Sequence, residues 1–169
     1  MSSGMSRKGI VLMSMLALAL GPVSWVSSEE QAASKDIVET AMAAGQFSTL
    51  VKAIQTAGLV EVLKGPGPFT VFAPTDQAFS ELPAEELDAL MKDPAKLKQL
   101  LLHHVVAGKL MGQEVAKQTS LKTLQGGELE VTLDDKDLLV DDGLVVQADI
   151  QASNGVIHTI DTVLLLSEE

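Results

Sequence analysis

Two segments far apart in the chain decide the fold: Phe69–Phe79 (FTVFAPTDQAF) and Asn154–Leu164 (NGVIHTIDTVL). Both are rich in β-branched and aromatic residues, which favour strands. Pro74 is expected to end the first strand, because proline lacks the N–H that strand pairing uses. Asn154-Gly155 predicts a tight hairpin turn before the second strand, because both residues tolerate positive φ. Each segment is therefore predicted to be a strand with a sharp boundary at one end.

Upstream of the first segment, apolar residues recur every three to four positions, which indicates amphipathic helices. Ser34 and Ser48 are predicted to cap the first two helices, and Gly45 and Gly58 to end them. A shorter helical turn is predicted over 59–63, before a Gly-Pro-Gly-Pro run that cannot continue a helix.

Downstream of the first segment, Thr75 or Asp76 is predicted to cap a turn. Proline near the first turn indicates two further helices, over 84–91 and 95–103. A short strand is expected at 105–106, and a weaker helical pattern lies near 113–117. The first half of the chain is thus mainly helical.

The second half changes from a period of 3.6 to a period of 2, which is typical of strands. Gly126-Gly127 is predicted as a two-residue hairpin turn, and Leu129, Val131 and Leu133 are expected to face the core. Helices first and strands later indicate an α+β domain. The predicted strands of this half cover 121–124, 128–133, 138–140, 144–150 and 156–166.

The N-terminus has the pattern of a secretory signal peptide. Arg7 and Lys8 precede an apolar run over Ile10–Leu20, which is too short to span a bilayer as a helix. Cleavage is expected after Ser28, and an uncleaved membrane anchor is the alternative. The predicted organisation is a signal peptide (1–28), a linker (29–34), a single domain (35–166) and a short tail (167–169).

Composition excludes several functions. The chain has 23 acidic and 12 basic residues, a net charge of −11, and no cysteine. Such a charge repels nucleic acid and anionic lipid, and an exported chain without cysteine has no disulfides. The four phenylalanines lie in apolar patterns that suggest burial, which argues against aromatic platforms for bases or sugars. They are Phe47, Phe69, Phe72 and Phe79.

Four blocks in order, at 36–65, 65–79, 101–108 and 148–164, resemble the fasciclin domain family. The resemblance implies an α+β fold in which a β-wedge of mostly antiparallel strands packs against a helical layer. It also implies a set of signature residues, which we interpret as structural: Phe69, Thr70, Phe72, Pro74, Thr75, Asp76, Phe79, His104, Asn154, Gly155, His158 and Asp161.

The resemblance implies a secreted or surface module for adhesion or extracellular-matrix contact. In some animal members, a Tyr-His pair and an Asp-Ile dipeptide are implicated in integrin engagement. Here the pair is His103-His104, and the dipeptide is Asp149-Ile150 with different flanks. We therefore do not carry integrin binding over, and keep Asp149 and Ile150 as a possible partner contact.

The titratable residues give no catalytic pattern. His158 shares strand parity with apolar neighbours and His104 lies on a leucine face, so both are interpreted as neutral core histidines. Asp161 has the opposite parity and is expected to pin a loop. Asp76 and Thr75 could form a polar site with a histidine, but a cap is favoured. The aspartates between 134 and 142 lack calcium-loop spacing, so a solvated edge is favoured over loose divalent-cation bridging.

We therefore predict a non-enzymatic adhesion or matrix-interaction module that is exported to the periplasm, cell surface or medium. Its expected partner is a protein or matrix component of the cell envelope, without nucleic acid, cofactor, metal or a membrane span after signal cleavage. The alternative is a binding protein for a small hydrophobic ligand, with Met42, Met91 and Met111 lining a pocket between helices and strands. A hydrolase that depends on His104 is a third hypothesis.

Overall fold

The computed structural model describes residues 35–166. The predicted signal peptide, linker and tail lie outside the described residues. Within the described part of the chain, no helix is both long and apolar enough to cross a bilayer.

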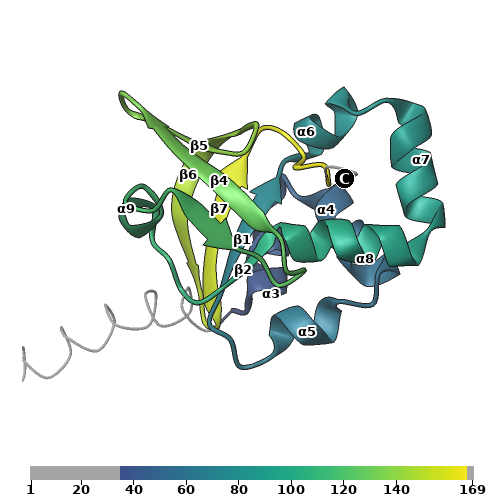
Figure 1. Cartoon of the computed structure of the whole chain (residues 1–169). Coiled ribbons are helices and arrows are strands. Elements are labelled where there is room, and N and C mark those ends of the chain that lie inside the picture. Colours follow the sequence, from purple (N-terminus) through teal and green to yellow (C-terminus); the bar gives the residue numbers. More distant parts are fainter. Residues whose placement is uncertain (1–34, 167–169) are drawn as a thin grey trace, which may run out of the picture. The chain divides into compact units, whose positions relative to one another are not determined.

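Helices dominate the first half of the described chain and strands the second (Figure 1). The helices are α3 (Ile37–Ala44), α4 (Ser48–Thr56), α5 (Val60–Lys64), α6 (Asp76–Glu81), α7 (Ala84–Lys92), α8 (Pro94–His103) and α9 (Gly112–Val115). The strands are β1 (Phe69–Pro74), β2 (Val105–Ala107), β3 (Ser120–Lys122), β4 (Glu128–Asp134), β5 (Asp137–Val140), β6 (Gly143–Ala152) and β7 (Gly155–Ile160).

The strands form a 7-stranded sheet in the order β2-β1-β7-β6-β5-β4-β3. β1 and β7 run parallel, and the other paired strands of the sheet are antiparallel. Its two end strands meet, because Val106 bridges to Thr123 and the Leu124 N–H donates to the Val105 carbonyl at 2.8 Å. The sheet therefore curls closed and covers its own edges. This arrangement confirms the predicted α+β class with mostly antiparallel strands.

Two apolar cores hold this fold together. The larger lies between the helices and the sheet, and includes Phe47, Phe79 and Leu97. The smaller fills the inside of the curled sheet around Phe72 and Leu129. Burial of these side chains contributes roughly 1.5–3 kcal/mol each and is the main stabilising term in a chain without cysteine.

The first two helices begin differently from the prediction. The side chain of Asp36, rather than Ser34, caps α3 by accepting from the Glu39 N–H at 2.8 Å. Ser48 is the first residue of α4, and its preceding residue Phe47 makes no side-chain cap. The α4 cap comes instead from the side chain of Asp76, which is distant in sequence.

Three strand predictions also need correction. The first hairpin connects Lys122 to Glu128 through five residues, 123–127, instead of the two-residue turn expected at Gly126-Gly127. Leu133 has inward parity but is 55 % exposed, because it lies toward the far end of the β4–β5 hairpin, beyond the core. The last strand ends at Ile160 rather than 166.

Candidate functional site

The two segments that decide the fold lie side by side. β1 and β7 pair in parallel, from Phe69 opposite Gly155 to Pro74 opposite Ile160. Every residue of β7 is buried. The pair therefore lies in the interior of the sheet, flanked by β2 on one side and β6 on the other.

Asn154 fastens one end of this pair to the helices. Its side-chain amide donates to the carbonyls of Leu63 and Gly65, and its side-chain oxygen accepts from the Ile37 N–H at 3.1 Å. Its backbone carbonyl accepts from the Phe69 N–H at 3.0 Å. Asn154 thus joins α3, α5 and the start of β1 through one residue.

Gly155 is not the positive-φ turn residue that the sequence predicted. Ala152 pairs with Gly155, so the two turn residues are Ser153 and Asn154. Neither Asn154 nor Gly155 has positive φ. A Cβ at Gly155 would lie 2.0 Å from the Phe69 carbonyl oxygen. The position needs glycine because two backbones approach closely there.

Thr75 and Asp76 cap two different helices. The Thr75 hydroxyl accepts from the Ala78 N–H at 3.2 Å and caps α6. The Asp76 carboxylate accepts from the N–H groups of Ser48 and Thr49, at 3.2 and 2.7 Å, at the start of α4. Burial opposes ionisation of Asp76, but these hydrogen bonds outweigh it and lower its pKa.

Replacement of Asp76 should weaken the attachment of α4. We expect Asp76→Ala to lower the free energy of unfolding by about 1–2 kcal/mol, because two helix-start N–H groups lose their acceptor. Because folding lowers the pKa of Asp76 from 3.8, the stabilisation by its carboxylate is complete above pH 3.8. It is lost as the pH falls through the pKa of Asp76 in the folded state. Urea titrations at pH 7 measure the loss.

Asp88→Ala is the control, because Asp88 forms only an exposed pair with Lys92. This substitution should cost under about 0.5 kcal/mol. Equal losses for Asp76→Ala and Asp88→Ala would contradict the role of Asp76 as the cap of α4.

His104 is buried at 2 % exposure with both ring nitrogens occupied. Nδ1 lies 2.8 Å from the Leu100 carbonyl, so it carries the proton and donates. Nε2 then accepts from the Leu164 N–H at 3.0 Å. The His104 pKa is lowered to about 4, chiefly by burial and to a smaller extent by neighbouring His103, against the opposing effect of the Leu100 hydrogen bond. The neutral ring joins α8 to the segment after β7.

Both ring nitrogens of His158 are also hydrogen-bonded to backbone groups, but here the proton is on Nε2. Its Nε2–H donates to the Leu110 carbonyl at 2.7 Å, and its Nδ1 accepts from the Asp149 N–H at 3.3 Å. The ring stacks on Phe72 with centroids 5.5 Å apart. Burial lowers its pKa, although the Leu110 bond and the Asp149 charge oppose the shift.

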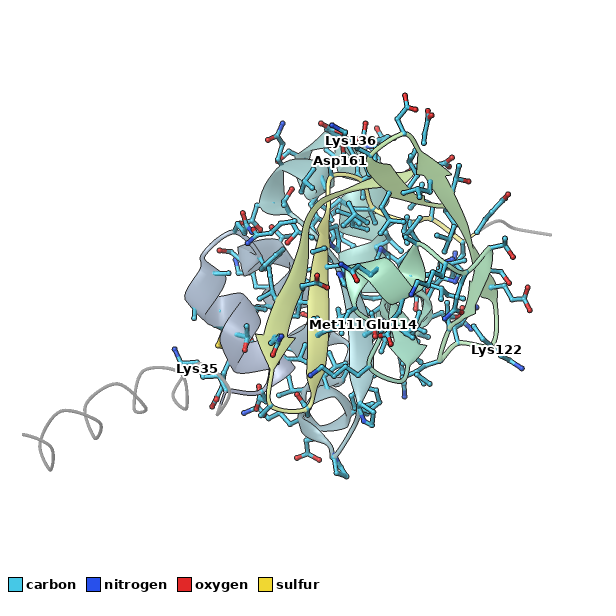
Figure 2. The ribbon with its side chains drawn as sticks, turned by 90° about the vertical axis from the view of Figure 1, so that its left-hand side faces the viewer. Lys35, Met111, Glu114, Lys122, Lys136 and Asp161 are labelled. Carbon is cyan, nitrogen blue, oxygen red and sulfur yellow. The ribbon has the colours of Figure 1, made fainter. Side chains whose placement is uncertain are left out.

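Asp149 and Ile150 are both engaged in the fold. Asp149 has φ of 61° within the irregular part of β6, and its carboxylate accepts from the Gly112 N–H at 2.6 Å. This bond anchors α9, whose start is closed by Glu114 accepting from the Met111 N–H (Figure 2). Ile150 pairs with Ile157 and packs on the larger core. Both residues of the dipeptide therefore stabilise the fold, and a partner could contact only the parts of them that stay exposed.

The remaining signature residues also connect elements. The Thr70 hydroxyl donates to the Gly108 carbonyl at 2.7 Å and accepts from the Leu110 N–H at 2.9 Å. Asp161 accepts from the Leu144 N–H at 3.0 Å, which pins the start of β6. Phe72, Pro74 and Phe79 are buried, whereas Phe69 is half-buried.

The sequence matches the fasciclin domain family model over residues 45–166. The chain belongs to the fasciclin domain family. The uncharacterized protein sll1735 of Synechocystis sp. is 40 % identical over 131 residues, which cover 78 % of this chain and 98 % of that protein. Transforming growth factor-beta-induced protein ig-h3 of Sus scrofa is 44 % identical over 119 residues, covering 70 % of this chain and 17 % of that protein. A FAS1 domain pair from the insect cell adhesion molecule fasciclin I has the same fold, with a TM-score of 0.67 and 18 % identity. The match covers 80 % of this chain and 52 % of that chain.

One polar contact of this fasciclin domain was missed by the sequence analysis. His103, 7 % exposed, has its Nε2 3.6 Å from the Asp141 carboxylate, which also accepts from the Glu130 N–H at 2.6 Å. Among the described residues, His103 Nδ1 has no hydrogen-bond partner. The contact joins α8 to the strands, and no local pattern reveals it because His103 and Asp141 are distant in sequence.

The described part of the fasciclin domain offers little for catalysis. It contains no cluster of three potential metal-binding side chains. Both nitrogens of His104 and of His158 are taken by backbone groups, so neither ring is free to act as a base. The space between α4, α5, α8 and the sheet is about 10 Å³, room for about one water molecule. Leucine, isoleucine and valine line it together with His104, and Met42 is 50 % exposed instead of lining a pocket.

Proposed function

We propose that this protein is a non-enzymatic, exported adhesion or matrix-interaction module. Membership of the fasciclin domain family carries the proposal. The relatives include Cell surface glycolipoprotein MPB83 of Mycobacterium bovis, 36 % identical over 124 residues that cover 70 % of this chain and 55 % of that protein. One of the solved structures with a similar fold comes from an insect cell adhesion molecule. Both ring nitrogens of the buried His104 are hydrogen-bonded to backbone groups, which supports a binding role over a hydrolase that depends on His104. The proposed partner is a protein or matrix component of the cell envelope.

The test is retention on a surface. The purified protein is coated on beads, and the retained amounts of intact envelopes and of extracellular polysaccharide from the producing organism are measured. A protein of the same size and net charge is the control. We expect retention severalfold above this control, because specific contacts add to any charge effect. Retention equal to the control for both materials would overturn the proposal.

A further inference from the structure

A cleft of about 290 Å³ opens at the end of the β1–β7 pair. Its walls are the Gly-Pro-Gly-Pro loop before β1 and the turn between β6 and β7. The volume is close to the lower limit of ordinary small-ligand sites, roughly 300 Å³. The lining includes Pro66, Pro68, Lys109, Ser153 and Asn154.

The walls of the cleft are held in place by the contacts of Asn154. Its side chain bonds to Leu63, Gly65 and Ile37, so the turn cannot move away from the helices without losing three hydrogen bonds. On the opposite wall, a Cβ at Gly67 would lie 2.3 Å from the Asn154 carbonyl oxygen, which shows how closely the two walls meet. A preformed cleft of this kind binds with a small ordering cost.

The charged side chain that lines the cleft is basic, although the protein as a whole is acidic. Lys109 is the charged side chain of the lining, and it forms no ion pair with a carboxylate in the described residues. Two more lysines adjoin the cleft through the backbone. The Lys35 carbonyl accepts from the Ser153 N–H at 2.8 Å, and Lys64 precedes Gly65. The nearby Asp36 is already engaged, with the Glu39 N–H and with Lys64 at 3.9 Å.

A cluster of aspartates lies at the other end of the same sheet: Asp134, Asp135, Asp137, Asp141 and Asp142. Asp141 and Asp142 precede β6 at Gly143, whereas the cleft lies after β6 at Ala152. The ten residues of β6 place these ends roughly 30 Å apart. Figure 2 shows Lys35 far from Lys136, which lies on the acidic β4–β5 hairpin. An anion at the cleft is therefore separated from this aspartate cluster by nearly four Debye lengths at physiological salt, taking each as about 8 Å.

We propose that this cleft binds an anionic sugar unit of a matrix polysaccharide, with the Lys109 ammonium on its carboxylate or sulfate group. The Ser153 hydroxyl bonds to sugar hydroxyls, and the rings of Pro66 and Pro68 contact the apolar face of the sugar. The contacts to the sugar ring come from these prolines, because residues 35–166 have no fully exposed aromatic side chain to stack on it. The cleft is larger than a free phosphate needs and has one cation, which suits a singly charged sugar. The inference rests on the proposed matrix function and names its ligand.

Calorimetric titration of the purified protein tests the site with five probes: hexagalacturonate, a sulfated hexasaccharide, neutral maltohexaose, hexaglutamate and inorganic phosphate. We expect the protein to bind hexagalacturonate or the sulfated hexasaccharide, and the one that binds more tightly identifies the anionic group. Maltohexaose, hexaglutamate and inorganic phosphate should bind at least tenfold more weakly. Lys109→Gln should weaken the sugar affinity about tenfold, as expected for loss of a charged hydrogen bond. Lys136→Gln, at the opposite end, is the matched control and should change it less than twofold.

Several outcomes would overturn the inference: no binding of either anionic sugar, equal affinity for hexaglutamate, or equal affinity in the wild type and Lys109→Gln. The bead assay separates this failure from failure of the proposed function. If the wild type retains envelopes or polysaccharide but binds neither anionic sugar, the adhesion function stands and the cleft assignment is wrong. If the sugar binds at the cleft while beads retain nothing, the site stands and the adhesion function is wrong.

Discussion

Gly155→Ala should destabilise the domain considerably more than Gly45→Ala. The new Cβ would lie 2.0 Å from the Phe69 carbonyl oxygen and 2.9 Å from Ile37 Cδ1. The first contact is with backbone, so the clash is relieved only if β1 and β7 separate. That movement would weaken the central pairing of the sheet and the Asn154 bonds beside it. We expect a loss of about 3 kcal/mol or more in the free energy of unfolding.

Gly45→Ala provides the matched control for this effect. Gly45 has φ of 75°, and no atom lies within 4 Å of the place that a Cβ would take, so the substitution strains the backbone without a clash. It should cost about 1 kcal/mol. Urea unfolding of the two variants at pH 8 measures the difference, and soluble yield reports on a Gly155→Ala protein that fails to fold. A loss for Gly155→Ala no greater than for Gly45→Ala would show that the sheet accommodates the methyl group.

The case of Gly155 shows where sequence reasoning reached its limit. Asn154-Gly155 correctly indicates a hairpin at this place, but the turn residues are Ser153 and Asn154, one position earlier. The cause was misread, since the local pattern cannot reveal that Phe69 lies opposite Gly155. Parallel pairing of strands so distant in sequence leaves no periodic signal. The resemblance to a known family identified both segments as signature blocks of one domain, but it did not predict that they pair with each other.

The polar contacts were predictable to different degrees. The burial of His104 and His158 followed from helix and strand parity, because a side chain shares the environment of its periodic neighbours. The sequence predicted that Thr75 or Asp76 caps the turn after β1, and Thr75 is the residue that does so. Asp76 reaches α4 instead of its own helix, and His103 reaches Asp141. Contacts of this kind depend on tertiary packing, which a capping rule cannot foresee.

The buried His104 should make the protein unstable in mild acid. Histidine titrates near pH 6.5 in the unfolded chain, whereas the folded-state pKa is about 4. Between these values the unfolded state binds a proton that the folded state does not, so unfolding becomes easier as the pH falls. The stabilising contribution is complete above pH 6.5, decreases across this range and stops decreasing below about pH 4. It amounts to about 3 kcal/mol, and His158 adds a loss in the same direction.

A substitution at His104 separates this effect from other acid effects. His104→Leu keeps an apolar side chain of similar size but leaves the Leu100 carbonyl and the Leu164 N–H without partners. We expect it to lower the free energy of unfolding at pH 8 by about 2–4 kcal/mol. Because the variant cannot bind the proton, its deficit relative to the wild type should shrink by roughly 3 kcal/mol between pH 8 and pH 4.

Urea titrations of both proteins at intervals from pH 8 to pH 4 measure this deficit directly. NMR titration of the wild-type His104 ring supplies an independent reading, and the ring should remain neutral at pH 5.5, where a free histidine is mostly charged. A deficit that stays constant with pH would mean that His104 is not the group responsible for acid sensitivity. A ring that titrates near pH 6.5 would show that Nε2 releases the Leu164 N–H at little cost. Either result would contradict a neutral imidazole that joins α8 to the segment after β7.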